Sequence, residues 1–454
     1  MVEWKDKEDI NESQTTNDKQ QITNNKQPTT NNNSMLKQYQ KLSLLTVALI
    51  SCGLTTADYA KAGELQERQQ TKQLIDGLYT ENLDAARYFQ QGLRLYNLRE
   101  LRGAEQAFRK ALELDSSIAM AHYLLGNSLL GQGEPRLAVQ QYNQAIRLEP
   151  NLSEAYYNLG LAFYQQDQPE KAIQAYKRAI TLNPDFDTAR YNLGLAFESQ
   201  GNDQQASVQY QEAVRLNPNN ATAQYNLARL LVKEGKSEEA IEALQQVVAL
   251  NPELLPAQYQ LGILLVEQGR QEEAKESFFQ ATRIDDEYAP AHYQLGLIFL
   301  EEGDFKEASN RFDWVTRLQP NNAEAYRQLG AAKLKEEEYE EALTALQSAV
   351  ALDSNNALSH YNLGVALQKL ERNEEAIAQY RKAVRLNPRM SEGFFNLGIL
   401  LGQSGEKRQA IALLRRAKAL FVAEDKPERV RQVDLYIKEF SARGTSSVTT
   451  EESR

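Results

Sequence analysis

The 34 residues from Ser153 to Phe186, SEAYYNLGLAFYQQDQPEKAIQAYKRAITLNPDF, recur along the chain with the same length and pattern. The next 34 residues begin DTARYNLGLAF, and the 34 after those begin ATAQYNLARLL. With Ser153 as position 1, ten repeats follow one another without insertion or deletion. They begin at Ala85, Ala119, Ser153, Asp187, Ala221, Leu255, Ala289, Ala323, Ala357 and Ser391. Tandem repeats of this length are typical of a fold in which each repeat packs on its neighbours.

Two sets of positions within the repeat predict two helices. Positions 3, 4, 7, 8 and 11, and positions 20, 21, 24, 27 and 28, are mostly apolar or small at helical spacing. Position 20 is Ala in all ten repeats, while Leu at position 7 and Gly at position 8 each occur in nine. Gly lowers helix propensity by about 1 kcal/mol relative to Ala. Its recurrence therefore predicts a close approach of the second helix, with Ala at position 20 as the small residue that faces it.

Two further positions predict where the helices end. Position 15 is Gly in six repeats, which favours a turn between the two helices. Position 32 is Pro in six repeats, and Pro prevents the second helix from continuing.

This pattern resembles the tetratricopeptide repeat (TPR) family over residues 85–424. The resemblance implies an all-α fold, a right-handed superhelical solenoid of helix–turn–helix repeats. The Trp that the family has at position 4 never occurs here, and three repeats have histidine instead: His122, His292 and His360. Residues 425–442 have helical periodicity but do not match the repeat, which predicts a helix that caps the C-terminal end of the array.

The segments outside the array differ from it in composition. Residues 1–34 are rich in Asn, Gln and Thr and have little to bury, which predicts disorder. Residues 63–84 are polar and predict a linker, and residues 443–454 predict a disordered tail. Residues 35–62 contain an apolar run of 13 residues, Leu42 to Leu54, preceded by two lysines. This run is too short to span a bilayer, which needs about 20 residues. Its length is typical of the apolar part of a secretory signal.

Three interpretations of residues 35–62 are open. Leu49-Ile50-Ser51-Cys52 resembles a bacterial lipobox, in which Cys52 would be lipidated and attach the mature chain to a membrane. Ala60-Lys61-Ala62 resembles an ordinary signal peptidase site, which would release a soluble chain beginning at Gly63. In the third interpretation the run is an uncleaved anchor. Met1 and Met35 are both open as the start of translation, and because a signal normally lies at the N-terminus, the polar residues before it favour Met35.

Composition argues against several classes of function. A net charge of -11 disfavours nucleic acid as a ligand, since phosphate binding needs clustered Lys and Arg. Cys52 is the single cysteine, so no intrachain disulfide or cysteine-based zinc site is expected. The three histidines lie five and two repeats apart and cannot converge on one metal. No catalytic motif or cofactor motif is found, and we expect a protein without enzymatic activity, metal or cofactor.

The candidate site lies in the first helix of each repeat, whose positions 2, 5, 6, 9, 12 and 13 line the concave face in this family. Position 5 is mostly Tyr and position 6 is mostly Asn or Gln. An amide side chain can both donate to and accept from a peptide backbone, and a tyrosine adds apolar area with a polar tip. The amide row resembles the one in the repeat array of O-linked N-acetylglucosamine transferases, whose catalytic domain has no counterpart here.

These two rows are the predicted peptide-binding residues. The amides are Asn158, Asn192, Asn226, Gln260, Gln294, Gln328, Asn362 and Asn396, and the tyrosines are Tyr157, Tyr191, Tyr225, Tyr259 and Tyr293. In the alternative interpretation, the tyrosines pack between repeats and the amides stabilise helix–helix contacts. The predicted function is an exported scaffold that binds an extended peptide or partner subunits in its concave groove. The alternative is a cytoplasmic or membrane-attached regulatory subunit of a larger complex.

Overall fold

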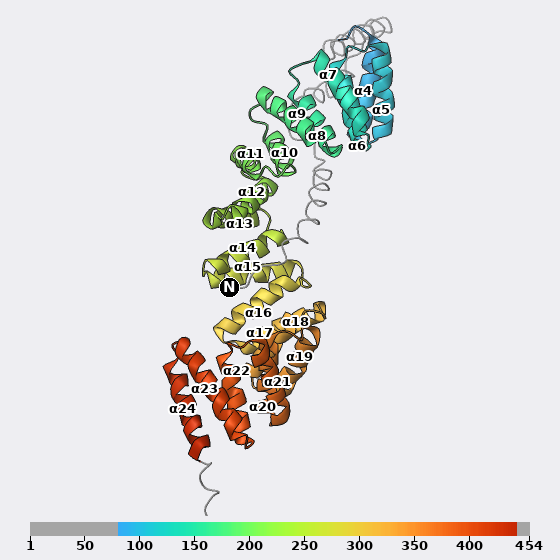
Figure 1. Ribbon diagram of the computed structural model, residues 1–454. Coiled ribbons are helices and arrows are strands. Elements are labelled where there is room, and N and C mark those ends of the chain that lie inside the picture. Colours follow the sequence, from blue (N-terminus) through green and yellow to red (C-terminus); the bar gives the residue numbers. More distant parts are fainter. Residues whose placement is uncertain (1–79, 443–454) are drawn as a thin grey trace, which may run out of the picture. The chain divides into compact units, whose positions relative to one another are not determined.

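The computed structural model describes residues 80–442, in which α-helices follow one another and no β-strand is present (Figure 1). This confirms the predicted all-α class and the tandem helix–turn–helix arrangement. The predictions for residues 1–34, for residues 35–62 with Cys52, and for residues 443–454 lie outside the described residues, as do residues 63–79 of the predicted linker. The linker prediction extended too far, because its last residues, Leu83 and Asp84, begin the first helix. Between residues 80 and 442, no helix combines the length and the apolar character needed to cross a bilayer.

Each repeat between residues 83 and 423 contributes two helices, which we call its A helix and its B helix. The A helices are α4 (Leu83–Asn97), α6 (Ala119–Gly131), α8 (Ser153–Gln165), α10 (Asp187–Glu198), α12 (Ala221–Lys233), α14 (Leu255–Glu267), α16 (Ala289–Glu302), α18 (Ala323–Lys335), α20 (Ala357–Lys369) and α22 (Ser391–Gln403). The B helices are α5 (Leu101–Leu114), α7 (Pro135–Leu148), α9 (Pro169–Leu182), α11 (Asp203–Leu216), α13 (Ser237–Leu250), α15 (Gln271–Ile284), α17 (Phe305–Leu318), α19 (Tyr339–Leu352), α21 (Asn373–Leu386) and α23 (Lys407–Ala423). A last helix, α24 (Pro427–Ala442), follows the tenth repeat.

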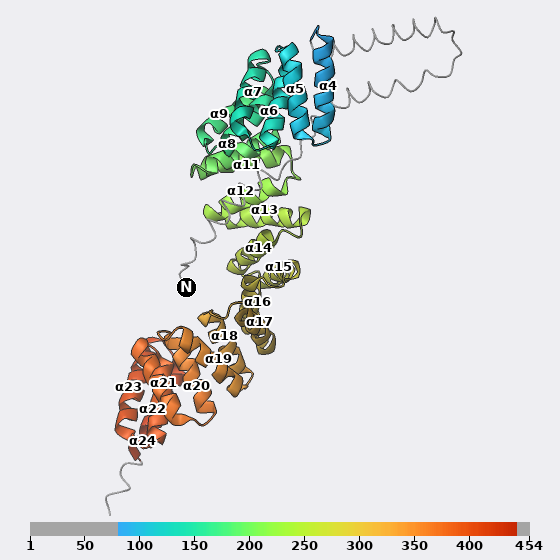
Figure 2. The same ribbon diagram turned by 90° about the vertical axis from the view of Figure 1, so that its right-hand side faces the viewer.

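The helices form two compact bodies, the first ending at Leu230 and the second beginning at Leu231, within α12. In the first body, each A helix from α4 to α10 packs against the B helix of its own repeat, and α5, α7 and α9 pack against the A helix that follows (Figure 2). The second body shows the same alternation from α13 to α24. Each body therefore buries its own clusters of apolar side chains, which follow one another along the repeats.

The glycine at position 8 faces an aromatic ring in seven of the nine repeats that have it, and a leucine in the other two. A Cβ atom on Gly160 would lie 2.5 Å from Cε1 of Tyr176, and a Cβ atom on Gly194 would lie 2.5 Å from Cε1 of Tyr210. Both rings are fully buried. The sequence correctly predicted a close approach of the B helix. The side chain nearest to the glycine is at position 24, and in the tenth repeat the carbonyl oxygen of Ala410, at position 20, also lies 3.3 Å from the Cβ position of Gly398.

The turn between A and B helices has the same backbone conformation in all ten repeats of the described chain. The residue at position 15 has a positive φ whether it is Gly, as in Gly303 with φ 80°, or not. Four repeats have other residues there: Arg99, Asp167, Glu337 and Glu371. The predicted glycine turn is thus formed, and four side chains adopt a left-handed conformation that L-residues disfavour.

In six repeats the side chain at position 4, where the family has Trp, contacts the loop that precedes the repeat. The Gln224 amide donates to the carbonyl of Pro218 at 2.9 Å, and Gln258 donates to that of Pro252 at 3.2 Å. Histidine makes the same contact in three repeats: Nε2 of His292 lies 2.9 Å from the Asp286 carbonyl oxygen, and His122 and His360 have equivalent contacts. The polar residues at this position therefore link the end of one repeat to the start of the next.

Candidate functional site

The tyrosine row and the amide row bond to each other across consecutive repeats. Nδ2 of Asn192 donates to the phenol oxygen of Tyr157 at 3.0 Å, one repeat earlier. In the same way Asn158 donates to Tyr123 at 3.1 Å, and Asn226 donates to Tyr191 at 3.4 Å. Each amide of the first body is thus tied to the preceding A helix.

The second body shows the same pairing of amide and tyrosine. Gln294 interacts with Tyr259 and Gln328 with Tyr293, and Asn396 donates to Tyr361 at 3.3 Å. The eighth repeat differs, because Arg327 takes the place of tyrosine there.

The tyrosine rings pack into the interior of each repeat. The ring of Tyr157 lies 6.0 Å from that of Tyr176, and the ring of Tyr259 lies 5.8 Å from that of Phe278, measured between centroids. Burial raises the pKa of the Tyr157 phenol, and it raises the pKa of Tyr259 and Tyr293 in the same direction. These phenols are therefore neutral near pH 7. The packing gives a physical basis to the structural role that the sequence left open for the tyrosines, while their contact with a peptide stays a prediction.

The amides differ in what they can offer to a ligand. Asn192 is 6% exposed and Asn226 is 3% exposed, whereas Asn158, Gln260, Gln294, Gln328, Asn362 and Asn396 are half-buried. The Asn158 amide nitrogen donates to Tyr123 and also to Asn127 at 2.8 Å. Its side-chain oxygen is then the group that can accept a hydrogen bond from a peptide N–H.

Arg327 changes the row locally. Its guanidinium donates to the carboxylate of Glu324, with Nε at 2.8 Å. That carboxylate also accepts from Gln328 at 3.2 Å and from Tyr293 at 3.4 Å. The next amide, Asn362, consequently lacks a phenol to bond to. Its half-buried side chain makes no hydrogen bond within residues 80–442. Asn362 therefore keeps both the donor and the acceptor functions of its amide.

The three histidines remain separate, as their spacing requires. His122 and His360 each contact a glutamine of their own B helix through Nδ1 at 2.8 Å. His292 contacts Arg311 at 3.4 Å. Over residues 80–442, no three His, Cys, Asp or Glu side chains come together as ligands for a metal ion.

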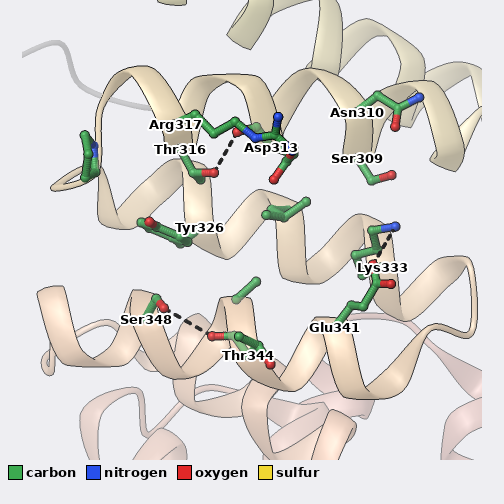
Figure 3. A pocket seen from close by; sticks show the side chains of 13 residues that line it. Ser309, Asn310, Asp313, Thr316, Arg317, Tyr326, Lys333, Glu341, Thr344 and Ser348 are labelled. Atoms are coloured by element: carbon green, nitrogen blue, oxygen red, sulfur yellow. Dashed lines mark hydrogen bonds and ion pairs between the residues drawn. The ribbon is translucent and has the colours of Figure 1, made fainter.

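One feature that the sequence did not predict is a polar hollow in the second body. It has a volume of about 700 Å³ and lies between α17, α18 and α19 (Figure 3). Tyr326 and Leu329 belong to its lining, together with hydroxyl and charged side chains. The sequence feature that could have indicated this hollow is Lys333 at position 11, where the other nine repeats have Leu or Phe.

Comparison with known sequences gives matches to repeat families only. A family described as TPR repeat matches residues 136–167, 160–201 and 332–371. Families described as tetratricopeptide repeat match residues 191–254, 231–295 and 357–390. No curated protein matches the sequence significantly.

Several solved structures are similar to part of this chain. A structure of MamA shares 27% identity and covers 36% of this chain and 94% of its own, with a TM-score of 0.34. PilF of Pseudomonas aeruginosa shares 25% identity and covers 46% and 95%, with a TM-score of 0.41. YrrB, described as a TPR protein with an unusual peptide-binding site, shares 24% identity and covers 41% and 96%, with a TM-score of 0.38. The family matches and the helix pairs together establish that this chain contains tetratricopeptide repeats.

Proposed function

We propose that this chain is a protein-interaction scaffold without enzymatic activity, which binds an extended peptide or partner subunits along its A helices. The observation that carries the proposal is the series of half-buried amides at position 6, one per repeat from Asn158 to Asn396 except for the buried Asn192 and Asn226. Their side-chain oxygens recur with the repeat and can accept hydrogen bonds from N–H groups of an extended backbone. Recognition of this kind holds the backbone and leaves specificity to side chains between the amides.

The experiment compares two triple variants of the full chain in pull-downs from the native host. The first replaces the half-buried amides Asn158, Gln260 and Asn362 with Ala. The control replaces three exposed glutamines of B helices with Ala: Gln205, Gln245 and Gln347. We expect the control to recover the partner as the wild type does and the first variant to lose it at least fivefold.

Thermal unfolding followed by circular dichroism checks that both variants are folded. The Asn158 substitution also removes the hydrogen bonds to Tyr123 and Asn127, at a cost of about 1 kcal/mol. Equal partner recovery by a folded first variant would show that the amides serve only the packing of the repeats.

The location of the protein is a separate proposal, and the amino-terminal sequence supports it. We propose export to the cell envelope, with Cys52 as the candidate lipidation site. Mass spectrometry of the mature N-terminus separates the interpretations: diacylated Cys52 supports a membrane-attached lipoprotein, and a start at Gly63 supports a soluble exported form. An intact Met35 would contradict cleavage and favour the regulatory subunit, in the cytoplasm or attached to the membrane.

A further inference from the structure

Positive charge is concentrated on the last two repeats of the array. Residues 373–423, from α21 to α23, contain nine Lys and Arg and four Glu, although the whole chain has a net charge of -11. The B helices of these repeats are α21 and α23, and α22 packs against both of them (Figure 1). This part of the second body is therefore basic in a chain that is acidic as a whole.

Most of this positive charge is not neutralised by neighbouring side chains. Three of the four glutamates have an arginine partner, and these pairs are Glu375 with Arg372, Glu392 with Arg429, and Glu406 with Arg381. Six cations are exposed and form no ion pair within residues 80–442: Lys382, Arg385, Arg389, Arg408, Arg415 and Arg416. We call these six residues the basic face. Their charges are available to a partner.

The basic face lies on one side of the second body. Positions 25 and 26 of the repeat are Arg381 and Lys382 in α21, and Arg415 and Arg416 in α23. Equivalent positions in consecutive repeats point in similar directions, because stacked repeats are related by a small rotation. The two repeats also touch here, since the Arg416 guanidinium donates to the carbonyl of Pro388 at 3.4 Å. The six cations thus form one surface that spans two B helices.

The composition of the basic face differs from that of a typical protein interface. Protein interfaces are commonly anchored by exposed aromatic side chains that fill pockets on the partner. None of the four aromatic residues within residues 373–423 is exposed: Tyr380, Phe395 and Phe421 are buried, and Phe394 is half-buried. The basic face therefore offers positive charge on exposed side chains without an aromatic anchor.

We propose that the basic face docks on a bilayer surface that contains anionic phospholipids. Each Lys or Arg close to such a surface favours binding by about fivefold. Lipid headgroups diffuse laterally, so they can gather opposite six separate cations without a matching shape. Charges elsewhere on the chain are screened beyond about 8–10 Å. The local excess of positive charge therefore decides which side of the acidic chain approaches the lipids.

The basic face does not depend on peptide binding by the A helices, because it belongs to two B helices and to the loop that follows α21. It is consistent with two of the three interpretations of residues 35–62, since a lipidated Cys52 and an uncleaved anchor would both attach the chain to a membrane. Stable attachment commonly combines a hydrophobic anchor with a patch of basic residues. The basic face would supply the second of these two contacts.

Co-sedimentation of the full chain with lipid vesicles tests the proposal. One set of vesicles contains about one third phosphatidylglycerol, which is anionic, in phosphatidylcholine, and the other set contains phosphatidylcholine alone. We expect the chain to bind the anionic vesicles at least tenfold more tightly at about 0.05 M salt. The preference should disappear at about 0.5 M salt, because the Debye length is then shorter.

Two triple variants locate the contact. The first changes three cations of the basic face to Gln, Arg385, Arg408 and Arg415, and should lose at least tenfold in affinity for the anionic vesicles. The control removes the same charge from the first body by changing three exposed arginines to Gln, Arg94, Arg136 and Arg147, and should stay within twofold of the wild type. Residues 35–62 are the same in both variants, so the difference between them reports on the basic face.

Two results would overturn the proposal. One is equal binding of the wild type to both sets of vesicles; if the soluble peptide acetyl-decaglutamate-amide nevertheless binds, the basic face is a site for an acidic protein segment. The other is an equal loss of affinity in the two triple variants, which would mean that lipid binding follows the net charge of the chain and not this surface. Thermal unfolding followed by circular dichroism verifies that both variants are folded.

Discussion

At the scale of the residue, Gly160 shows why nine of the ten repeats have glycine at position 8. An added methyl group would meet the Tyr176 ring at 2.5 Å, and that ring is fully buried and cannot move aside. Alanine would gain about 1 kcal/mol of helix propensity, but overpacking a core costs about 1–3 kcal/mol. The fifth repeat has Ala228 at position 8 and Leu244 at position 24. Ala and Leu can thus occupy the two positions together, although Leu at position 24 also accompanies Gly, as in Gly330 with Leu346.

Gly160→Ala is therefore expected to lower the free energy of unfolding by up to about 2 kcal/mol, the overpacking cost less the gain in propensity. Urea unfolding of Gly160→Ala, Tyr176→Leu and the double variant measures the effect and its cause. The double variant should lose less than the sum of the two single losses. If the two losses of stability are strictly additive, contact with the Tyr176 ring is not the reason for glycine at position 8.

His292 is a second residue whose surroundings make a measurable prediction. Burial lowers the pKa of this imidazole, and the nearby Arg311 cation acts in the same direction. The unfolded chain then binds more protons than the folded chain as the pH falls below about 6.5. The contribution of this residue to stability is complete above that pH and declines as the pH falls toward the lower folded pKa.

His292→Gln keeps the bond to the preceding loop, because Gln224 and Gln258 make it at the same position. We expect the wild type to lose more stability than this variant between pH 7 and pH 5. Urea midpoints at a series of pH values measure the difference. Parallel curves for the two proteins would mean that protonation of His292 is not coupled to unfolding.

At the scale of the element, every A–B turn requires one residue with positive φ. Glu371 has φ 62° and is exposed, so its side chain contributes little that could offset the strain. A left-handed conformation costs an L-residue about 1–2 kcal/mol, and glycine avoids this cost at some expense of entropy.

Glu371→Gly should therefore raise the free energy of unfolding by about 0.5–1 kcal/mol. Gly303→Ala, the reverse change in the seventh repeat, should lower it by a similar amount. Chemical denaturation of both variants tests the pair. A loss of stability in Glu371→Gly would indicate that its side chain holds the turn.

Some features of the helices and turns could be predicted from the sequence, and others could not. The helix pairs, the glycine turn and the close approach at position 8 followed from spacing, because identical repeats must place identical side chains in identical surroundings. The hydrogen bond between the position 6 amide and the tyrosine of the preceding repeat could not be predicted. Sequence spacing does not show in which direction a side chain points relative to the neighbouring helix. The hollow at Ser309 and Thr316 could not be predicted either, because it depends on which side chains fill the junction between two B helices.

At the scale of the molecule, α24 covers the end of the last repeat. Phe440 is 4% exposed and its ring lies against Gly402, while Lys418 pairs with Asp434 of α24 at 2.6 Å. Lys418 stands at position 28, where most repeats have an apolar residue. The last repeat is thus adapted to a polar cap and not to a further repeat.

Phe440→Ala should destabilise α24 by about 3 kcal/mol, as truncations of buried aromatic residues do. Because each repeat contacts only its neighbours, the effect should decline along the array. Hydrogen exchange is expected to become faster in α24 and to remain unchanged in α16 and α17. Leu435→Ala, at a position 68% exposed on the same helix, is the control. Faster exchange throughout the second body would show that it unfolds as one cooperative piece.

The contacts that join repeats occur at constant sequence separations. Amide and tyrosine lie 35 residues apart, and the position 4 side chain bonds to the carbonyl six residues before it. Duplication or loss of a whole 34-residue segment in the gene would preserve both separations, whereas a gain or loss of one codon inside a repeat would break them. Evolution can therefore change the length of such an array in whole repeats. The eighth repeat is the exception, because Arg327 and Lys333 give it contacts that no copy of another repeat would supply.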